Sequence, residues 1–391
     1  MAFTSSDPDQ TDSFPAIASA AARSVIRHFG GPVLGLPGTH LAAVRRPGSV
    51  NNFVRPFHYW WQAHYADALV DVGWRELRTG ERVNGPSLPS AGELAARTVK
   101  TLVSRNFFRV TNSYYDDMAW LALAMGRLDA LAREAGKPGP GERLKLEHAL
   151  TDQLLSAATE DLGGGLFWNT KRDFKNTAAT APAALHLARL GRRTPEYRQK
   201  AQGLVDWLEE HVLDDRGLYR DGVRITKGEP VLNEAVFSYN QGPVLGALLE
   251  LGGEENLRRA ARTVDAVKGH LTERRTHILT THGEGDGGLF TGILCRYLAT
   301  AAVDERLPEH TRSRAATLVT TTARLLWDGR GERWAHTGIV KRPERVLVFP
   351  RTPGAEAVRE YPGQTPVELS TQVQAWTVFE AAASIEEAAR R

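Results

Sequence analysis

The sequence is built from two kinds of helical segment that alternate along most of its length. Apolar residues recur three and four positions apart, which is the spacing of an α-helix. Segments of the first kind carry charges on one face and an apolar stripe on the other, which is typical of helices at a protein surface. Segments of the second kind are apolar nearly all round and rich in small residues, which indicates helices buried on every side.

The alternation repeats about every 50 to 60 residues and lengthens to about 80 before the last pair. The amphipathic segments span 14–29, 91–107, 142–160, 196–211, 254–271 and 309–327. The buried segments begin near residues 57, 114, 174, 234, 286 and 366. Six inner helices ringed by six outer ones predict an all-α fold, an (α/α)6 barrel, with an open α-solenoid as the alternative. Strand patterns are scarce, and 345–350 is the best candidate.

The composition excludes several classes of protein. Lys and Arg total 49 and Asp and Glu total 46, so the formal net charge is only +3. No run of basic residues is present that would follow a phosphate backbone, and no uncharged apolar stretch reaches the roughly 18 residues of a membrane span. The one cysteine, Cys295, cannot form an internal disulfide. We therefore expect no nucleic-acid partner and no membrane span.

We expect residues 1–391 to form a single domain with a disordered tail over about 1–12, and to act as a monomer. The N-terminal segment is polar and acidic, and it lacks the basic and apolar regions of a secretion signal. It therefore predicts a cytoplasmic protein.

Each buried segment opens with a polar or aromatic cluster. The clusters read FHYWWQ, TNSYYDD, FKN, SYNQG, GEGDGG and ELSTQ. Because the inner helices of such a ring run parallel, their first turns meet at one rim. Aromatic faces stack on the C–H surfaces of sugar rings, and amides and carboxylates bond sugar hydroxyls. The clusters therefore predict a carbohydrate-binding cleft at that rim.

The adjacent acids Asp116 and Asp117 are the sharpest chemical feature of these clusters. Acidic residues favour the first turn of a helix because of the helix dipole, and this alone explains many such pairs. Here the following helix is buried and two tyrosines precede the acids, which favours a chemical role. Two carboxyls close together raise the pKa of one of them, so that a proton donor lies beside an ionised partner. Such a pair suits glycoside hydrolysis by double displacement.

Other uses of paired aspartates fit the sequence poorly. A magnesium-binding Asp-Asp-x-x-Asp array needs an acid where the chain has Trp120. No His-Glu-x-x-His spacing for zinc occurs, so we expect no metal and no cofactor. His277 and His282 flank a Gly-rich loop and are interpreted as solvated loop residues, with a place at the rim as the alternative.

Eight further residues are predicted to bind the sugar. They are Trp61, Tyr115, Trp168, Asn176, Tyr239, Asn240, Gln241 and Asp286. One of Trp60 and Trp61 should face the core and the other the rim, and we favour Trp61 at the rim. Asn176 is equally well explained as a helix N-cap, and a turn-stabilising role is the alternative for Asp286.

Several of these segments resemble a known family. YYDDMAWLALA, KNTAATAPAALHLARL, YNQGPVLGAL and GDGGLFTGILCRYLA resemble, in this order, the hallmark segments of glycoside hydrolase family 76, and FHYWWQAHYADALVD is similar to its first inner helix. The resemblance implies an (α/α)6 barrel and a retaining endo-α-1,6-mannanase that needs no metal. It also implies that Asp116 is the nucleophile and Asp117 the acid/base. The residues that it implies for the sugar site are Tyr239, Asn240, Gln241 and Asp286.

The expected function is hydrolysis of α-1,6-linked mannosides, in a mannan backbone or in manno-oligosaccharides, with the choice between endo and exo cleavage open. The expected partner is accordingly an α-mannoside oligosaccharide or glycan. A sugar epimerase on the same barrel, with two histidines as acid and base, is one alternative. A non-catalytic glycan-binding protein is the other.

Overall fold

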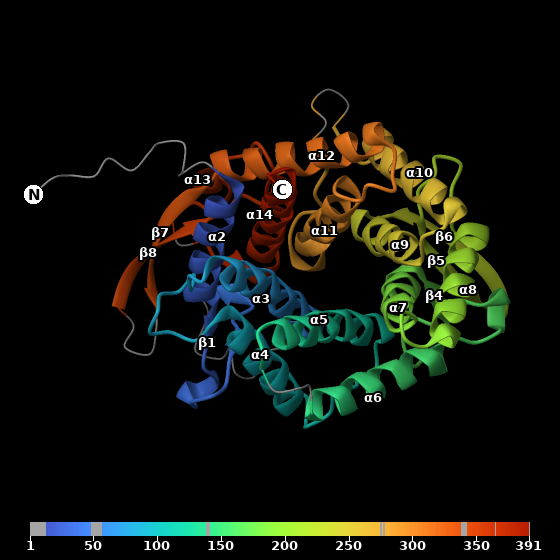
Figure 1. Cartoon of the computed structure of the whole chain (residues 1–391), viewed down its shortest axis with the longest axis horizontal. Coiled ribbons are helices and arrows are strands. Elements are labelled where there is room, and N and C mark those ends of the chain that lie inside the picture. The colour runs from blue at the N-terminus through green and yellow to red at the C-terminus, as the bar shows by residue number, and fades with distance from the viewer. Residues whose placement is uncertain are drawn as a thin grey trace, which may run out of the picture.

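The computed structural model describes residues 13–47, 57–137, 141–273, 276, 278–337, 342–363 and 365–390. Over these residues the fold is mostly helical, as predicted. Six long helices of the described chain form an inner ring (Figure 1). They are α3 (Tyr59–Thr79), α5 (Tyr115–Glu134), α7 (Thr177–Leu190), α9 (Ser238–Leu251), α11 (Phe290–Ala302) and α14 (Leu369–Ala389). Each packs on the next, and α14 packs on α3, so the ring closes.

Six further long helices in the described ranges surround this ring (Figure 1). They are α2 (Phe14–Phe29), α4 (Ala91–Arg105), α6 (Glu142–Ala157), α8 (Pro195–His211), α10 (Glu254–His270) and α12 (Glu309–Asp328). Helices α4, α6, α8, α10 and α12 each pack against the inner helix that precedes them, whereas α2 packs against α14. The predicted helical segments are confirmed. Closure through α14 also shows that the described helices do not form an open solenoid.

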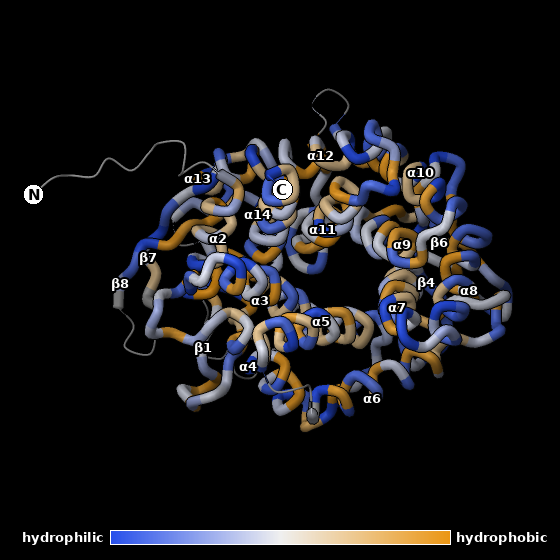
Figure 2. Tube along the Cα trace, viewed as in Figure 1, coloured by the Kyte–Doolittle hydropathy of each residue, from blue (hydrophilic) through white to orange (hydrophobic). Residues whose placement is uncertain are grey.

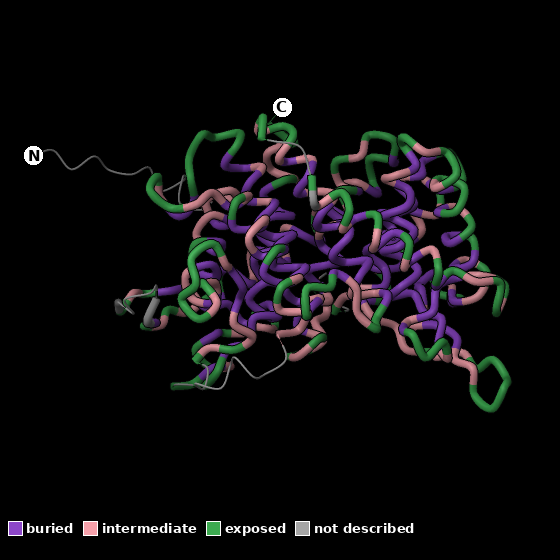
Figure 3. The backbone as a smooth tube through the Cα atoms, turned by 90° about the horizontal axis from the view of Figure 1, so that it is seen from below, coloured by how far each residue is buried: buried purple, intermediate pink, exposed green. Residues whose placement is uncertain are grey.

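Burial explains why the two kinds of helix take these places. In α7 every residue from Thr177 to Ala188 is buried, and in α14 every residue from Leu369 to Ala383. The outer α10 buries only a stripe, including Ala260, Val264 and Val267, which are spaced three and four residues apart. Figure 2 shows hydrophilic and hydrophobic residues interspersed along the outer helices, and Figure 3 shows burial concentrated in the interior.

Strands are few and short in the described chain. β7 (Gly331–Thr337) and β8 (Arg342–Val348) form an antiparallel hairpin on α2, and β8 overlaps the predicted strand at 345–350. A three-stranded antiparallel sheet was not predicted. It consists of β4 (Phe174–Asn176), β5 (Arg220–Thr226) and β6 (Glu229–Val236). Two-residue strands form two further pairs, β1 (Gly30–Gly31) with β2 (Leu41–Ala42), and β3 (Arg45–Arg46) with β9 (Val367–Glu368).

The first turns of the inner helices meet on one face of the ring. The start of α3 contacts the turn that precedes α11, and the start of α9 stacks on the first residue of α11. Strand β4 runs directly into α7, and β9 runs directly into α14. The polar clusters that open the buried segments are therefore brought together, as their parallel direction predicts.

Two of the sequence predictions lie beyond this description. The predicted disordered tail, residues 1–12, lies outside the described ranges, and a single domain over 1–391 stays a prediction. Within the described ranges, no helix combines the length and the apolar character that crossing a bilayer requires.

Candidate active site

Asp116 and Asp117 lie in the first turn of α5, as predicted. The backbone N–H of Tyr115 donates to the carbonyl of Trp168 at 2.8 Å, so the loop that carries Trp168 is fastened against the start of this helix. Both carboxyl groups are half-buried. Among the described residues, no basic side chain is one of the groups that shift the pKa of Asp116 or Asp117, so no salt bridge neutralises the pair.

Each carboxyl accepts a hydrogen bond from a different side chain. The indole Nε1 of Trp168 donates to Asp116 Oδ2 at 3.0 Å, and Asn112 Nδ2 donates to Asp117 Oδ2 at 2.6 Å. The other oxygen of Asp116, Oδ1, is buried and has no hydrogen-bond partner among the described residues. A buried oxygen that the protein holds in place but leaves unpaired requires an explanation, and a ligand atom supplies one.

Burial dominates the electrostatics of the pair. It raises the pKa of Asp116 to about 7; the Trp168 hydrogen bond lowers this pKa, and the charge of Asp286 raises it further. Burial also raises the pKa of Asp117 well above its usual range, and the neighbouring charge of Asp116 adds to that increase. Asp117 therefore holds its proton more strongly than an ordinary aspartate does, beside an Asp116 that is partly ionised near pH 7.

Asp286 lies in the short helix η4 (Gly285–Leu289) before α11, where two adjacent indoles reach it. Trp60 Nε1 and Trp61 Nε1 donate to Asp286 Oδ1 at 3.1 and 2.9 Å. Trp61, which we favoured at the rim, is 2% exposed and stacks on His58, whereas Trp60 is half-buried. The structure therefore reverses the expected exposure of the two tryptophans, although both contact the same carboxyl.

Tyr239 joins this cluster from the start of α9. Its ring stacks on Phe290, the first residue of α11, with centroids 4.0 Å apart. Burial raises the pKa of Tyr239 well above its usual range, and the charges of Asp221, Asp116 and Asp286 raise it further. The phenol therefore lies within electrostatic reach of acids from three different parts of the chain.

Asn240 faces Asp221, a carboxylate that the sequence analysis missed. Asn240 Nδ2 lies 3.5 Å from Asp221 Oδ1, and Asn233 Nδ2 donates to Asp221 Oδ2 at 2.9 Å. Asn240 Oδ1 is buried without a partner in the described chain, and burial raises the pKa of Asp221. Asp221 stands on β5, and because this strand was not predicted, nothing in the sequence placed the residue at the rim.

Two residues predicted to bind the sugar serve the fold instead. Gln241 is fully buried, and its side-chain amide exchanges two 2.8 Å hydrogen bonds with the backbone of Tyr219. Asn176 caps α7 by accepting a hydrogen bond from the N–H of Ala179 at 3.0 Å, which was the alternative considered for it. Neither amide is directed at the acid pair.

The two tyrosines before the acids also differ from expectation. Tyr115, predicted to bind the sugar, is 3% exposed and packs in the core. Tyr114 is 42% exposed, and its ring meets the ring of Trp168 edge-on with centroids 5.2 Å apart. The sequence analysis did not predict that Tyr114 and Asn112 belong to the site. Both lie in the TNSYYDD cluster that contains the acids, so their closeness to the acids in the sequence could have identified them.

Of the two histidine candidates, the structure describes His282. His282 is half-buried among Phe237 and Phe290, and its Nε2 accepts a hydrogen bond from the backbone N–H of Ser238 at 3.3 Å. It is packed rather than solvated, and burial lowers its pKa. His277 lies outside the described residues. No group of three or more His, Cys, Asp or Glu in the described ranges is arranged to hold a metal ion.

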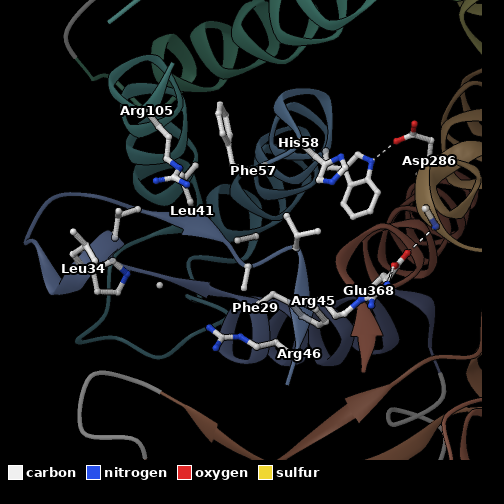
Figure 4. Close-up of a pocket in the computed structure, with 18 residues that line it drawn as sticks. Phe29, Leu34, Leu41, Arg45, Arg46, Phe57, His58, Arg105, Asp286 and Glu368 are labelled. Atoms are coloured by element: carbon white, nitrogen blue, oxygen red, sulfur yellow. Dashed lines mark hydrogen bonds and ion pairs between the residues drawn. The ribbon is translucent and has the colours of Figure 1, made fainter. Parts of the chain in front are cut away.

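A cavity of about 600 Å³ adjoins Asp286 (Figure 4). His58 and Trp61 line it beside Asp286, and its other walls come from the α2–α3 connection, the end of α4 and Glu368. Asp116 and Asp117 do not line this cavity. Asp286 therefore links the two regions, because it lines the cavity and its charge raises the pKa of both acids.

The chain is similar in sequence to several known proteins. Residues 38–342 match the sequence profile described as Glycosyl hydrolase family 76. A mannan endo-1,6-alpha-mannosidase of Candida glabrata is 30% identical over 215 residues, which cover 50% of this chain and 46% of that protein. The meiotically up-regulated gene 191 protein of Schizosaccharomyces pombe is 24% identical over 240 residues, which cover 58% and 53%. The chain spans about half the length of the curated relatives it matches.

Solved structures share the fold. The α-1,6-mannanase of Salegentibacter sp. HEL1_6 is similar with a TM-score of 0.78 at 24% identity, covering 95% of this chain and 100% of that chain. A variant of that mannanase with two consecutive aspartates replaced by asparagine is described as inactive, and its structure contains α-1,6-mannotriose. It is similar to this chain with the same TM-score and identity.

Proposed function

This chain belongs to glycosyl hydrolase family 76, and we propose that it is a retaining glycosidase that cleaves α-1,6-linked mannosides. The observation that carries the proposal is the placement of Asp116 and Asp117 in one helical turn with different hydrogen-bond donors and raised pKa values. The inactivity of the Salegentibacter mannanase without two consecutive aspartates supports the same chemistry.

We assign the nucleophilic attack to Asp116. Its Oδ2 accepts the Trp168 indole N–H, while Oδ1 has no hydrogen-bond partner among the described residues. As a carboxylate oxygen of Asp116 bonds to the anomeric carbon, the bond from that carbon to the glycosidic oxygen breaks, which gives a covalent mannosyl-enzyme. The indole N–H also favours the ionised carboxylate that this attack needs.

We assign proton transfer to Asp117. In the first step its proton goes to the departing glycosidic oxygen, which leaves as an alcohol. Once Asp116 is esterified, the charge that helped to raise the pKa of Asp117 is gone, so its pKa falls. Asp117 is then ionised and takes a proton from the water that attacks the anomeric carbon. Two inversions at that carbon restore its configuration.

We also assign the closed helical ring to the (α/α)6 barrel class, which the helix contacts and the shared fold of the family support. At its rim, Trp60, Tyr239 and Trp168 supply aromatic faces for sugar rings. Asp286 and the unpaired Asn240 oxygen supply partners for sugar hydroxyls. The cavity next to Asp286 offers room for sugar units beyond the one that is attacked.

The two alternatives lack a supporting observation. An epimerase needs an acid and a base on facing histidines, whereas His282 is packed between aromatic rings and accepts a backbone hydrogen bond. A purely glycan-binding protein has no use for two adjacent acids whose pKa values are both raised well above the usual range of aspartate.

The proposal is tested by incubating the protein with α-1,6-mannotetraose and following the products by NMR. Release of the α-anomer before mutarotation is expected, and first release of the β-anomer contradicts the double displacement. Asp116→Asn and Asp117→Asn should each lower the rate about 10²- to 10⁴-fold. The matched control is Asp215→Asn, the exposed member of the chain's other adjacent pair with Asp214, and it should leave the rate unchanged. Near-normal rates in both active-site variants would exclude the assigned roles.

A further inference from the structure

Four large apolar side chains are exposed on two loops beside the candidate site, and the proposed reaction uses none of them. Phe107 is 87% exposed and Phe108 83% exposed in the α4–α5 loop. Leu34 is 69% exposed and Leu36 55% exposed in the α2–α3 connection. Single exposed apolar residues are ordinary, but a group of this size points to an interaction surface.

The topology brings both loops to the rim that carries the acids. Each loop joins the end of an outer helix to the start of an inner helix, and the inner helices begin at that rim. The α4–α5 loop continues through Asn112, which donates to Asp117. Leu34 and Arg105, the last residue of α4, line the same cavity next to Asp286, as Figure 4 shows.

Three of these four residues adopt an unfavourable backbone conformation. Phe107, Phe108 and Leu34 all have left-handed backbones, with φ of 54°, 59° and 51°. Bulky residues rarely adopt this conformation, and it persists where the surroundings enforce it. In the α4–α5 loop Asn106 supports it, because its Nδ2 donates to the carbonyls of Arg109 at 2.8 Å and Thr111 at 3.0 Å.

The chain segments that carry the exposed side chains are basic. Residues 31–46 and 100–112 contain no Asp or Glu, and they carry Arg45, Arg46, Lys100, Arg105 and Arg109. Arg45 is paired with Glu368, whereas Arg109 is exposed immediately beside Phe108. Apolar side chains on a loop tip with basic neighbours are the combination that binds the interface of a bilayer with anionic headgroups.

We propose that the 33–36 and 106–109 loops form a membrane-contact surface that docks the rim of the ring onto an anionic lipid bilayer. The four apolar side chains enter the headgroup region, and Arg109 contacts lipid phosphates. Docked in this way, the protein presents its acid pair to glycans attached at the membrane. The surface itself is inferred from exposure, backbone and charge, and it stands whether or not the proposed hydrolysis is correct.

The test measures co-sedimentation of the full chain with vesicles of phosphatidylcholine and phosphatidylglycerol. We expect binding at low salt that weakens at high salt and is far weaker with phosphatidylcholine alone. The double variant Phe107→Asn, Phe108→Asn replaces both rings with asparagine, which tolerates the left-handed backbone. It should lower the partition coefficient about tenfold or more while the melting temperature stays at or above that of the wild type.

Trp334→Asn is the matched control. Trp334 is 66% exposed on the β7–β8 hairpin and belongs to neither loop, so its loss should leave vesicle binding unchanged. The proposal is overturned if the wild type does not sediment with anionic vesicles, or if Trp334→Asn weakens binding as much as the double variant. Equal binding to neutral vesicles overturns the role of Arg109. Activity on a soluble mannoside is measured separately, so failure of the hydrolase proposal is distinguishable.

Discussion

Replacing Trp168 with phenylalanine removes the hydrogen bond to the proposed nucleophile and keeps most of the aromatic packing. The indole N–H donates to Asp116 Oδ2 at 3.0 Å, and it opposes the burial that raises the pKa of Asp116 to about 7. A hydrogen bond to a charged group contributes about 1.5 to 3 kcal/mol, which corresponds to roughly one to two pKa units. The pKa of Asp116 in Trp168→Phe should therefore be about 8 to 9.

This shift has a measurable consequence for the rate. With a pKa of about 7, half of Asp116 is ionised at pH 7, whereas with a pKa of 8 to 9 only about 1 to 10% is. The value of kcat/KM at pH 7 should fall about 5- to 50-fold, and the acidic limb of its pH profile should move up by about one to two units. The control Trp334→Phe should not move it. An unchanged acidic limb in Trp168→Phe would refute the assignment of Asp116 as the group that must be ionised.

Three further predictions concern stability. Because burial raises the folded-state pKa of Asp116 from 3.8 to about 7, the wild type loses stability as pH rises through that range. Calorimetry should therefore give Asp116→Asn a higher melting temperature than the wild type at pH 8 and the same melting temperature at pH 4. Lys175→Met removes an ammonium that donates to three backbone carbonyls of the 159–164 loop, so urea titration should show a loss of about 3 kcal/mol or more, and full stability would contradict this role. Gln241→Leu leaves the backbone of Tyr219 unpaired and should cost about 1 to 3 kcal/mol in the same assay, whereas a change under 0.5 kcal/mol would show that water replaces the amide.

The features predicted well from the sequence are those set by burial over many residues. The inner helices are apolar on all sides and the outer ones on a single stripe, so their order and most of their boundaries followed from periodicity alone. Asp116 and Asp117 fell in the first turn of a buried helix for the same reason. The β5–β6 hairpin was missed because most of its residues are exposed or half-buried, and the alternation of apolar and polar residues covers only 223–226.

The details of the site depended on contacts that the sequence does not reveal. Adjacent residues on a helix point about 100° apart, so one of Trp60 and Trp61 had to turn inward. The one that turns inward is Trp61, whose ring stacks on that of His58. Gln241 sits in a cluster typical of sugar binding, but an amide can serve a ligand or a backbone equally well, and here it serves the backbone of Tyr219.

The most direct test of the central claim is to trap the covalent intermediate. An α-mannosyl fluoride with fluorine also at C2 should lose its anomeric fluoride and form an ester that hydrolyses slowly, because the C2 fluorine destabilises the positive charge of the transition state. Mass spectrometry of the intact protein and of its peptides should then find one fluoromannosyl group, attached to Asp116. A label on Asp117 or on another residue, or turnover of the reagent with no labelled protein at any time, would contradict the proposed division of roles.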